Sequence, residues 1–191
     1  DDIVPEYTVR DDLVLSLHDN DLVLIANLNV DVRAAETREL VVQTSPDWIV
    51  ANVAGKKVTD YDVRDIAGVR NVHIFFKDGI LGTELVELRL EKALSDDARS
   101  FAAPNFALKG AKSERGDLVL AAEKGFRLTA SSVEGVREIR TGATALTVSG
   151  AQQAFRFKEA GWKIAVDIDR TTASIHSEIF HLVSIGEGVL Y

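Results

Sequence analysis

The sequence predicts an all-β fold, either one large antiparallel β-sandwich or two closely packed ones. The strongest observation is an alternation of period two over residues 22–33, in which every even position is apolar. These even positions are Leu22, Leu24, Ala26, Leu28, Val30 and Val32. Later runs repeat the alternation, turn-forming clusters separate them, and no amphipathic helix lies between them, which together favour packed antiparallel sheets.

The first predicted strand pair is a hairpin around Asp19-Asn20-Asp21, a turn-forming cluster. It joins residues 13–17, whose leucines share one face, to the long strand that starts at Leu22. After a break at residues 34–36, residues 40–43 and 47–53 predict two short strands. Pro46 separates these two strands, because proline has no amide hydrogen for a strand ladder. Ala54-Gly55-Lys56 is the next predicted turn.

A second hairpin is predicted at Lys77-Asp78-Gly79, because Asp-Gly suits the positive φ of a tight turn. Residues 69–76 alternate before it, and a partner strand should start near residues 81–83. Residues 84–94 contain good helix formers, but Val86, Leu88 and Leu90 alternate with charged residues. We favour a strand over a helix here, since the hairpin turn requires a partner.

Residues 95–103 have no sustained apolar period and lead into Pro104, so they are the predicted linker. Any domain boundary is expected in this stretch. We therefore expect one β-sandwich layer or subdomain over residues 1–95, a second β-rich layer or subdomain over residues 104–191, and a possible seam at 95–104.

The second half of the chain predicts strands at both of its ends and a loop in its middle. Residues 116–123 and 125–130 predict a strand pair around Glu123-Lys124-Gly125. The remaining predictions follow in chain order: a short element of either type at 131–140, a loop with one short strand at 141–153, an alternating strand at 162–169, a turn at 170–172 and a long strand at 173–185.

Composition excludes several functional classes. The chain has 30 acidic and 22 basic residues, a net charge of -8, and its basic residues do not cluster, so nucleic acid is not an expected partner. No apolar run approaches the roughly 20 residues that span a bilayer, so this segment is not expected to insert in a membrane. The absence of cysteine excludes a disulfide scaffold, a thiol nucleophile and thiolate zinc sites. The absence of methionine and the ending Gly188-Val189-Leu190-Tyr191 favour an internal fragment of a larger protein.

No residue pattern indicates catalysis or a cofactor. Gly-x-Ser-x-Gly is absent, and with 30 acidic residues some carboxylate pair is expected by chance. The histidines show no metal-ligand spacing, and His181 is expected to be a half-buried structural residue; the four are His18, His73, His176 and His181. Asp19-Asn20-Asp21 and Asp167-Ile168-Asp169 offer oxygen ligands for calcium, but solvated turn acids are the favoured interpretation because the EF-hand pattern is missing. We expect no catalytic residue, no cofactor and no metal site.

Two tryptophans carry the alternative function, carbohydrate binding. Sugar-binding β-sandwiches use exposed aromatic rings, and Trp48 and Trp162 are the candidates for this role. Trp48 stands beside Pro46 at a strand start, and Trp162 begins an apolar stripe. Both positions favour a core or lid residue over a sugar platform.

From Gly116 onward a series of short segments follows in order. The segments are Asp117-Leu118-Val119-Leu120-Ala121-Ala122, Gly125-Phe126-Arg127-Leu128, Glu134-Gly135-Val136, Phe155-Arg156-Phe157 and Trp162-Lys163-Ile164-Ala165-Val166. Their order resembles the β-rich regions of large bacterial cell-envelope proteins. The resemblance covers residues 116–191 and implies an exported multi-domain parent protein located in the periplasm or cell envelope. The leading hypothesis is accordingly a non-catalytic structural or protein-interaction module, whose partner is another protein or a neighbouring domain of the same chain. A carbohydrate-binding module is the alternative, and a glycosidase with a carboxylate pair is a third interpretation.

Overall fold

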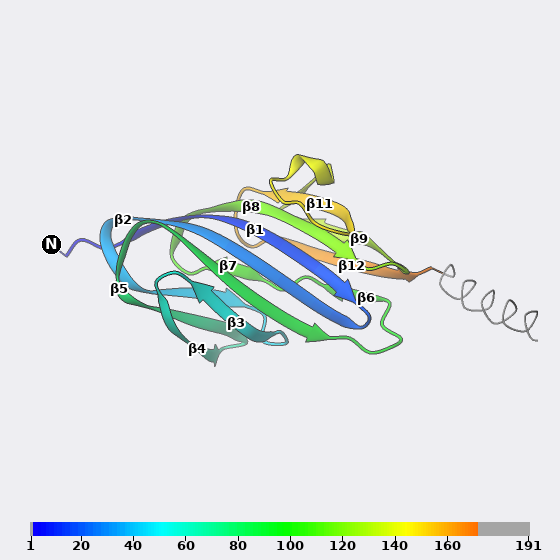
Figure 1. Cartoon of the computed structure of the whole chain (residues 1–191), viewed down its shortest axis with the longest axis horizontal. Helices are drawn as coiled ribbons and strands as arrows, with labels where there is room; N and C mark the ends of the chain where they lie inside the picture. The colour runs from blue at the N-terminus through cyan, green and yellow to red at the C-terminus, as the bar shows by residue number, and fades with distance from the viewer. Residues whose placement is uncertain (1, 172–191) are drawn as a thin grey trace, which may run out of the picture.

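The structure, a computed structural model, describes residues 2–171 and confirms the all-β prediction (Figure 1). Within these residues the chain forms twelve strands and one short 3₁₀ turn, η1. The elements are β1 (Glu6–His18), β2 (Asp21–Thr44), β3 (Ile49–Gly55), β4 (Val58–Ile66), β5 (Val69–Ala93), β6 (Ser100–Ala102), β7 (Phe106–Leu108), β8 (Ala111–Ala122), β9 (Phe126–Glu134), β10 (Arg137–Ile139), η1 (Thr141–Ala143), β11 (Ala151–Phe157) and β12 (Lys163–Arg170).

The strands form two sheets. The large sheet has nine strands in the order β10-β11-β8-β1-β2-β5-β3, with β4 also paired to β5 and β7 also paired to β2. The small sheet has the order β6-β12-β9. Every pairing is antiparallel except that of β1 with β8, which is parallel. The expectation of purely antiparallel sheets is therefore wrong at this pair, because β8 reaches β1 after a long connection instead of a tight turn.

The first predicted hairpin is confirmed, but the break after it is not. Leu17 pairs with Leu22, and Asp19 in the turn has a φ of 52°. β2 does not end at residues 34–36. It bends there, with Ala34 at a φ of 70° and a shift in register between Val32 and Thr37, and continues to Thr44.

The hairpin predicted at Lys77-Asp78-Gly79 is wrong, because β5 runs through it as one strand. Both halves of β5 pair with β2, so the strand bends where β2 bends and does not reverse. Glycine is favoured at one position of this bend, because Gly82 has a φ of 82°, a conformation that other residues rarely adopt. The choice of strand over helix for residues 84–94 is confirmed.

β3 and β4 lie end to end along the other edge of β5. Ile49 pairs with Glu91 at one end, and Ile66 pairs with Val69 at the other. The turn between them at residues 56–57 lies at the level of the bends in β2 and β5, which agrees with the predicted turn at Ala54-Gly55-Lys56. In Figure 1 β2 and β5 bend together at the left of the molecule, and β3 and β4 lie in its lower part.

β8 and β9 do not form the predicted pair. β8 lies between β1 and β11 in the large sheet, while β9 pairs with β12 in the small sheet. The chain therefore crosses from one sheet to the other at residues 123–125. The strand predicted at residues 162–169 is confirmed as β12, and residues 173–185, with His176 and His181, lie outside the described residues.

The core lies between the inner face of the large sheet and the small sheet. Alternate residues of β1, β2 and β5 are fully buried, as the period-two pattern predicts, and they meet buried residues of β6, β9 and β12. Burial of this apolar area is the main stabilising term of the fold. One hydrophobic cluster contains side chains from before and after residues 95–104, and the division of the chain into two subdomains at this seam stays a prediction.

Candidate functional site

The two candidate sugar-binding tryptophans are core residues. Trp48 is 1% exposed and Trp162 is 3% exposed. The Trp48 carbonyl accepts a 2.6 Å hydrogen bond from Arg70, and the Trp162 ring packs against Phe157 with the ring centroids 5.5 Å apart. Neither indole forms an exposed platform of the kind that carbohydrate recognition uses.

A buried carboxyl pair, Asp11 and Glu114, lies where β1 and β8 run parallel. Asp11 occupies the inner face of β1 between Val9 and Leu13, and both carboxyl side chains are buried. Glu114 Oε1 accepts a 2.8 Å hydrogen bond from the amide of Leu108, whereas both Asp11 oxygens and Glu114 Oε2 have no partner among the described residues. A proton shared between the two carboxyl groups would give two of these three oxygens a partner, as in other close acid pairs.

Burial raises the pKa of Asp11 well above its ordinary value, and the nearby Glu114 and Asp12 carboxyl groups raise it further. Gly116 stands directly opposite Asp11, and a Cβ at this position would lie 1.9 Å from the Asp11 carbonyl oxygen. Only glycine therefore lets β8 approach β1 beside the pair. This pair was not predicted from the sequence, although Asp11 is a charged residue in the apolar phase of residues 9–17.

A third buried acid, Asp117, lies on the opposite face of β8 and has a partner. Arg156 on β11 donates two hydrogen bonds to it, at 2.8 and 3.1 Å. Hydrogen bonding to Asp117 raises the pKa of Arg156, so the guanidinium stays protonated at all physiological pH values. This bidentate pair ties β8 to β11 and is structural.

Two glutamines of β11 connect the two sheets. Gln152 accepts a 2.7 Å hydrogen bond from the amide of Leu128 and donates one of 2.8 Å to the carbonyl of Phe126. Gln153 accepts a 2.8 Å hydrogen bond from the amide of Ala130. These side chains satisfy backbone groups of β9 that no neighbouring strand pairs, and so they close this edge of the small sheet.

The remaining candidate ligands lie apart from one another. His18 is exposed at the end of β1, and His73 is paired with Glu39. Asp167 and Asp169 are exposed residues of β12 and not of a turn. Within residues 2–171 no three histidine or acidic side chains come close enough to hold a metal ion, and no helix of this region has the length and apolar character of a membrane span.

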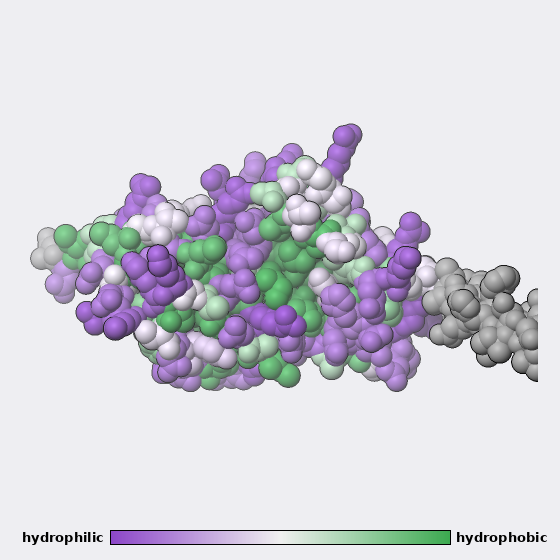
Figure 2. Space-filling model, viewed as in Figure 1, coloured by the Kyte–Doolittle hydropathy of each residue, from purple (hydrophilic) through white to green (hydrophobic). Residues whose placement is uncertain are grey.

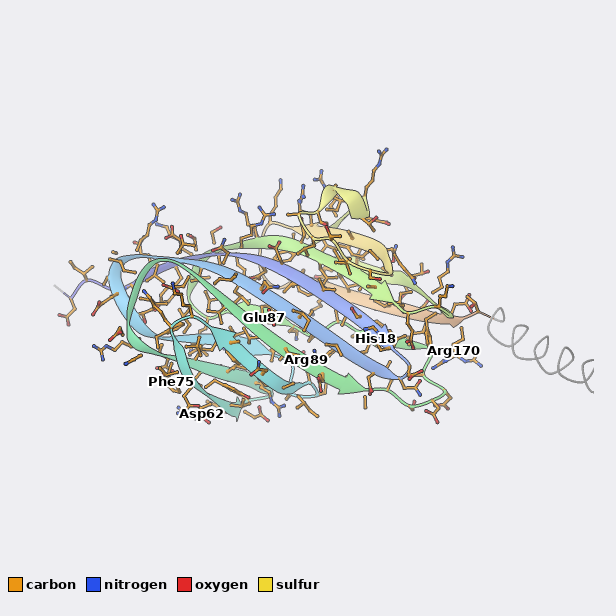
Figure 3. All side chains as sticks on the ribbon, in the orientation of Figure 1. His18, Asp62, Phe75, Glu87, Arg89 and Arg170 are labelled. Atoms are coloured by element: carbon orange, nitrogen blue, oxygen red, sulfur yellow. The ribbon has the colours of Figure 1, made fainter. Side chains whose placement is uncertain are left out.

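The outer face of the large sheet is the face turned away from the core, and it carries partly exposed apolar side chains. Strand register places Val14 of β1, Ile25 of β2 and Arg89 of β5 side by side on it. Val14 and Ile25 are half-buried, and Leu85 on the same face is 59% exposed. Figure 2 shows an apolar area over the middle of β1 and β2 with hydrophilic side chains around it, and Figure 3 shows Glu87 and Arg89 on β5 beside this area. An apolar centre with a charged rim is typical of a protein-docking surface.

No protein-family model matches the chain, and no curated protein is similar to it in sequence. Solved structures are similar in fold. Leukotriene A4 hydrolase from Saccharomyces cerevisiae matches with a TM-score of 0.50 and 10% identity, over 86% of this chain and 29% of the hydrolase chain. A two-domain M1 zinc metallopeptidase bound to L-tryptophan matches with a TM-score of 0.51 and 10% identity, over 85% of this chain and 43% of the peptidase chain.

A substrate-bound M1 zinc metallopeptidase from Deinococcus radiodurans matches with a TM-score of 0.51 and 11% identity, over 85% of this chain and 42% of the peptidase chain. This chain thus spans less than half the length of each of these enzymes. At such low identity the similarity concerns the fold alone: residues 2–171 adopt a β fold that also occurs as one part of longer metallopeptidase chains.

Proposed function

We propose that this chain is a non-catalytic β module of a larger multi-domain protein, and that the outer face of its large sheet packs against a neighbouring domain of the same protein. The observation that carries the proposal is the match of 85% of this chain to only 43% of a two-domain peptidase chain. In that enzyme a fold of this kind makes up less than half of a longer chain. The apolar centre of the outer face is the surface through which such packing is stabilised.

The polar clusters of the described residues support a structural role. Asp11 and Glu114 are enclosed in the core, where no substrate reaches them, and Asp117 is neutralised by Arg156. The resemblance of residues 116–191 to cell-envelope proteins supports an exported bacterial parent. We place the module in the periplasm or cell envelope on that basis.

Immunodetection in the source cells tests the parent protein. An antiserum raised against the chain, whose mass is 20.8 kDa, should detect a clearly larger protein in the envelope or periplasmic fraction. A band at the mass of the chain alone contradicts the multi-domain proposal. A larger band confined to the cytosol contradicts only the location.

Matched charge substitutions test the docking face in the full-length protein. Leu85 on β5 and Val133 on β9 are both exposed apolar strand residues, at 59% and 47%, but only Leu85 lies on the outer face. Leu85→Glu should increase proteolysis at the domain junction, whereas Val133→Glu should not. Equal effects of the two variants contradict docking through this face. A panel of hydrolase substrates tests the non-catalytic assignment. The assignment is contradicted if the protein turns over a substrate and a single carboxylate or histidine substitution in residues 2–171 abolishes that turnover.

A further inference from the structure

β4 forms a free edge of the folded large sheet within the described part of the chain. Its only sheet partner there is β5. In Figure 1 the strand lies at the lower border of the molecule, and Figure 3 shows Asp62 at this border. The pairing of residues 60–66 with β5 is regular and contains no proline. A regular free edge presents unpaired backbone groups to other strands.

The hairpin that follows β4 determines which backbone groups point outward. Ile66 pairs with Val69 across the two-residue loop Ala67-Gly68, and the pair that closes such a loop is hydrogen-bonded. Because hydrogen-bonded pairs alternate along an antiparallel ladder, Arg64 and Asp62 also bond to β5. The amide and carbonyl groups of Tyr61, Val63 and Asp65 therefore point to the free edge. The Tyr61 amide agrees with this assignment, since it donates to the side chain of Asp60, at 2.8 Å, and not to β5.

The side chains on the exposed face of this edge form a self-complementary charge pattern. Asp62 and Arg64 flank Val63, are 48% and 56% exposed, and pair with each other at 2.7 Å. If a second β4 lies antiparallel with Val63 opposite Val63, each Asp62 faces the Arg64 of the other copy. These positions are non-hydrogen-bonded pairs of the new ladder, where facing side chains approach most closely.

We propose that two copies of this chain associate through antiparallel pairing of their β4 edges about Val63. The new ladder has hydrogen-bonded pairs at Val63 with Val63 and at Tyr61 with Asp65, where the Tyr61 amide exchanges the Asp60 side chain for the Asp65 carbonyl of the other copy. Two ion pairs join Asp62 of each copy to Arg64 of the other, in place of the pair within each strand. The contact is isologous, as a two-fold dimer requires. The charge order favours a second copy over an extended peptide without this order, because the antiparallel copy matches both charges. The neighbouring edge strand β3 does not offer this, since its register is interrupted between Val50 and Asn52.

Analytical ultracentrifugation of the chain at physiological ionic strength, over a concentration series, tests the pairing. The wild-type chain should show a concentration-dependent monomer–dimer equilibrium. Arg64→Glu should weaken dimerisation by about tenfold or more, because two attractive pairs become two repulsive ones. Asp62→Arg should do the same. The double variant with Asp62→Arg and Arg64→Asp restores opposite charges across the interface and should restore dimerisation.

Arg89→Glu is the matched control, because Arg89 is a half-exposed arginine of the outer face that pairs with Glu91 in its own strand. This variant should dimerise like the wild type. Circular dichroism of each variant checks that the fold is intact. A wild-type chain that stays monomeric, or a dimer that Arg64→Glu and Arg89→Glu weaken equally, overturns the proposal. A dimer that no single charge reversal weakens indicates another surface and also overturns it.

Discussion

At the scale of single residues, Asp11 shows how one buried carboxyl group makes stability depend on pH. The unfolded chain releases this proton near the ordinary value of 3.8, whereas the folded chain holds it to a higher pH because burial raises the pKa. The stabilising contribution of the protonated group is therefore fully present below about pH 4 and is lost as the pH rises through the pKa of the folded state.

Asp11→Asn should remove this dependence. The amide is neutral at every pH and has nearly the shape of the protonated acid, so the variant should be more stable than the wild type at pH 7 by about 1–3 kcal/mol. The difference should shrink as the pH falls towards 4. Urea unfolding of both proteins between pH 4 and pH 7.5 measures it, and parallel stability profiles for the two proteins would contradict the assignment.

Ala67 is strained in the two-residue loop between β4 and β5. Its φ is 51° and that of Gly68 is 78°, a conformation that favours Asn-Gly. Ala67→Asn should raise the free energy of unfolding by about 0.5–1 kcal/mol. Ala54→Asn, at an exposed strand position without positive φ, is the control and should give no gain. Thermal unfolding measures the stability of the two variants. An equal gain in stability in the control variant would contradict the claim that the backbone at Ala67 is strained.

At the scale of elements, the two glutamines that close the β9 edge make a residue-specific prediction. Gln152→Ala should accelerate hydrogen exchange at the Leu128 amide, and Gln153→Ala should do so at Ala130, because each variant removes one acceptor. Each change should cost about 1–2 kcal/mol of stability, since a partly buried amide is left unpaired. Gln43→Ala, which removes a hydrogen bond to Asn71 on another strand, should leave both amides protected.

The existence of strands was predictable from period two, and so was the β1–β2 hairpin, but most other strand ends and partners were not. Asp78-Gly79 signals a change of backbone direction, and only the neighbouring bend of β2 at Ala34 decides that β5 bends there and does not reverse. Likewise, the local pattern around Lys124 indicates two strands, but it does not say that they belong to different sheets. Pairing is decided by packing between distant segments, which a local pattern does not contain.

The candidate site was predictable only in part, for the same reason. Position beside Pro46 and within an apolar stripe favoured core roles for Trp48 and Trp162, and both are buried. The pairing of Asp11 with Glu114 depends on the parallel contact of β1 with β8, which no sequence spacing indicates. The outer face emerges only once the strand register places Val14 beside Ile25.

At the scale of the whole molecule, the two tryptophans are expected to hold the core together. Trp48→Ala and Trp162→Ala should each lower the free energy of unfolding by about 3–5 kcal/mol, because each removes a large buried side chain. Leu85→Ala, at an exposed position, should change it by less than about 0.5 kcal/mol. Urea unfolding measures the losses. A glycan array tests the carbohydrate-binding alternative. This alternative is supported if the wild type binds a glycan and either tryptophan variant loses the binding while it remains folded.

The central position of β1 has a consequence for biosynthesis. One edge of this strand pairs with β2, which follows after a two-residue loop. Its other edge pairs with β8, which is synthesised about 100 residues later. A growing polypeptide on the ribosome therefore carries an apolar hairpin with an open side until translation has passed Ala122. Because such long-range closure slows folding and leaves intermediates prone to aggregate, chaperone supply during translation should govern the yield of this protein more strongly than the equilibrium stability of its finished fold.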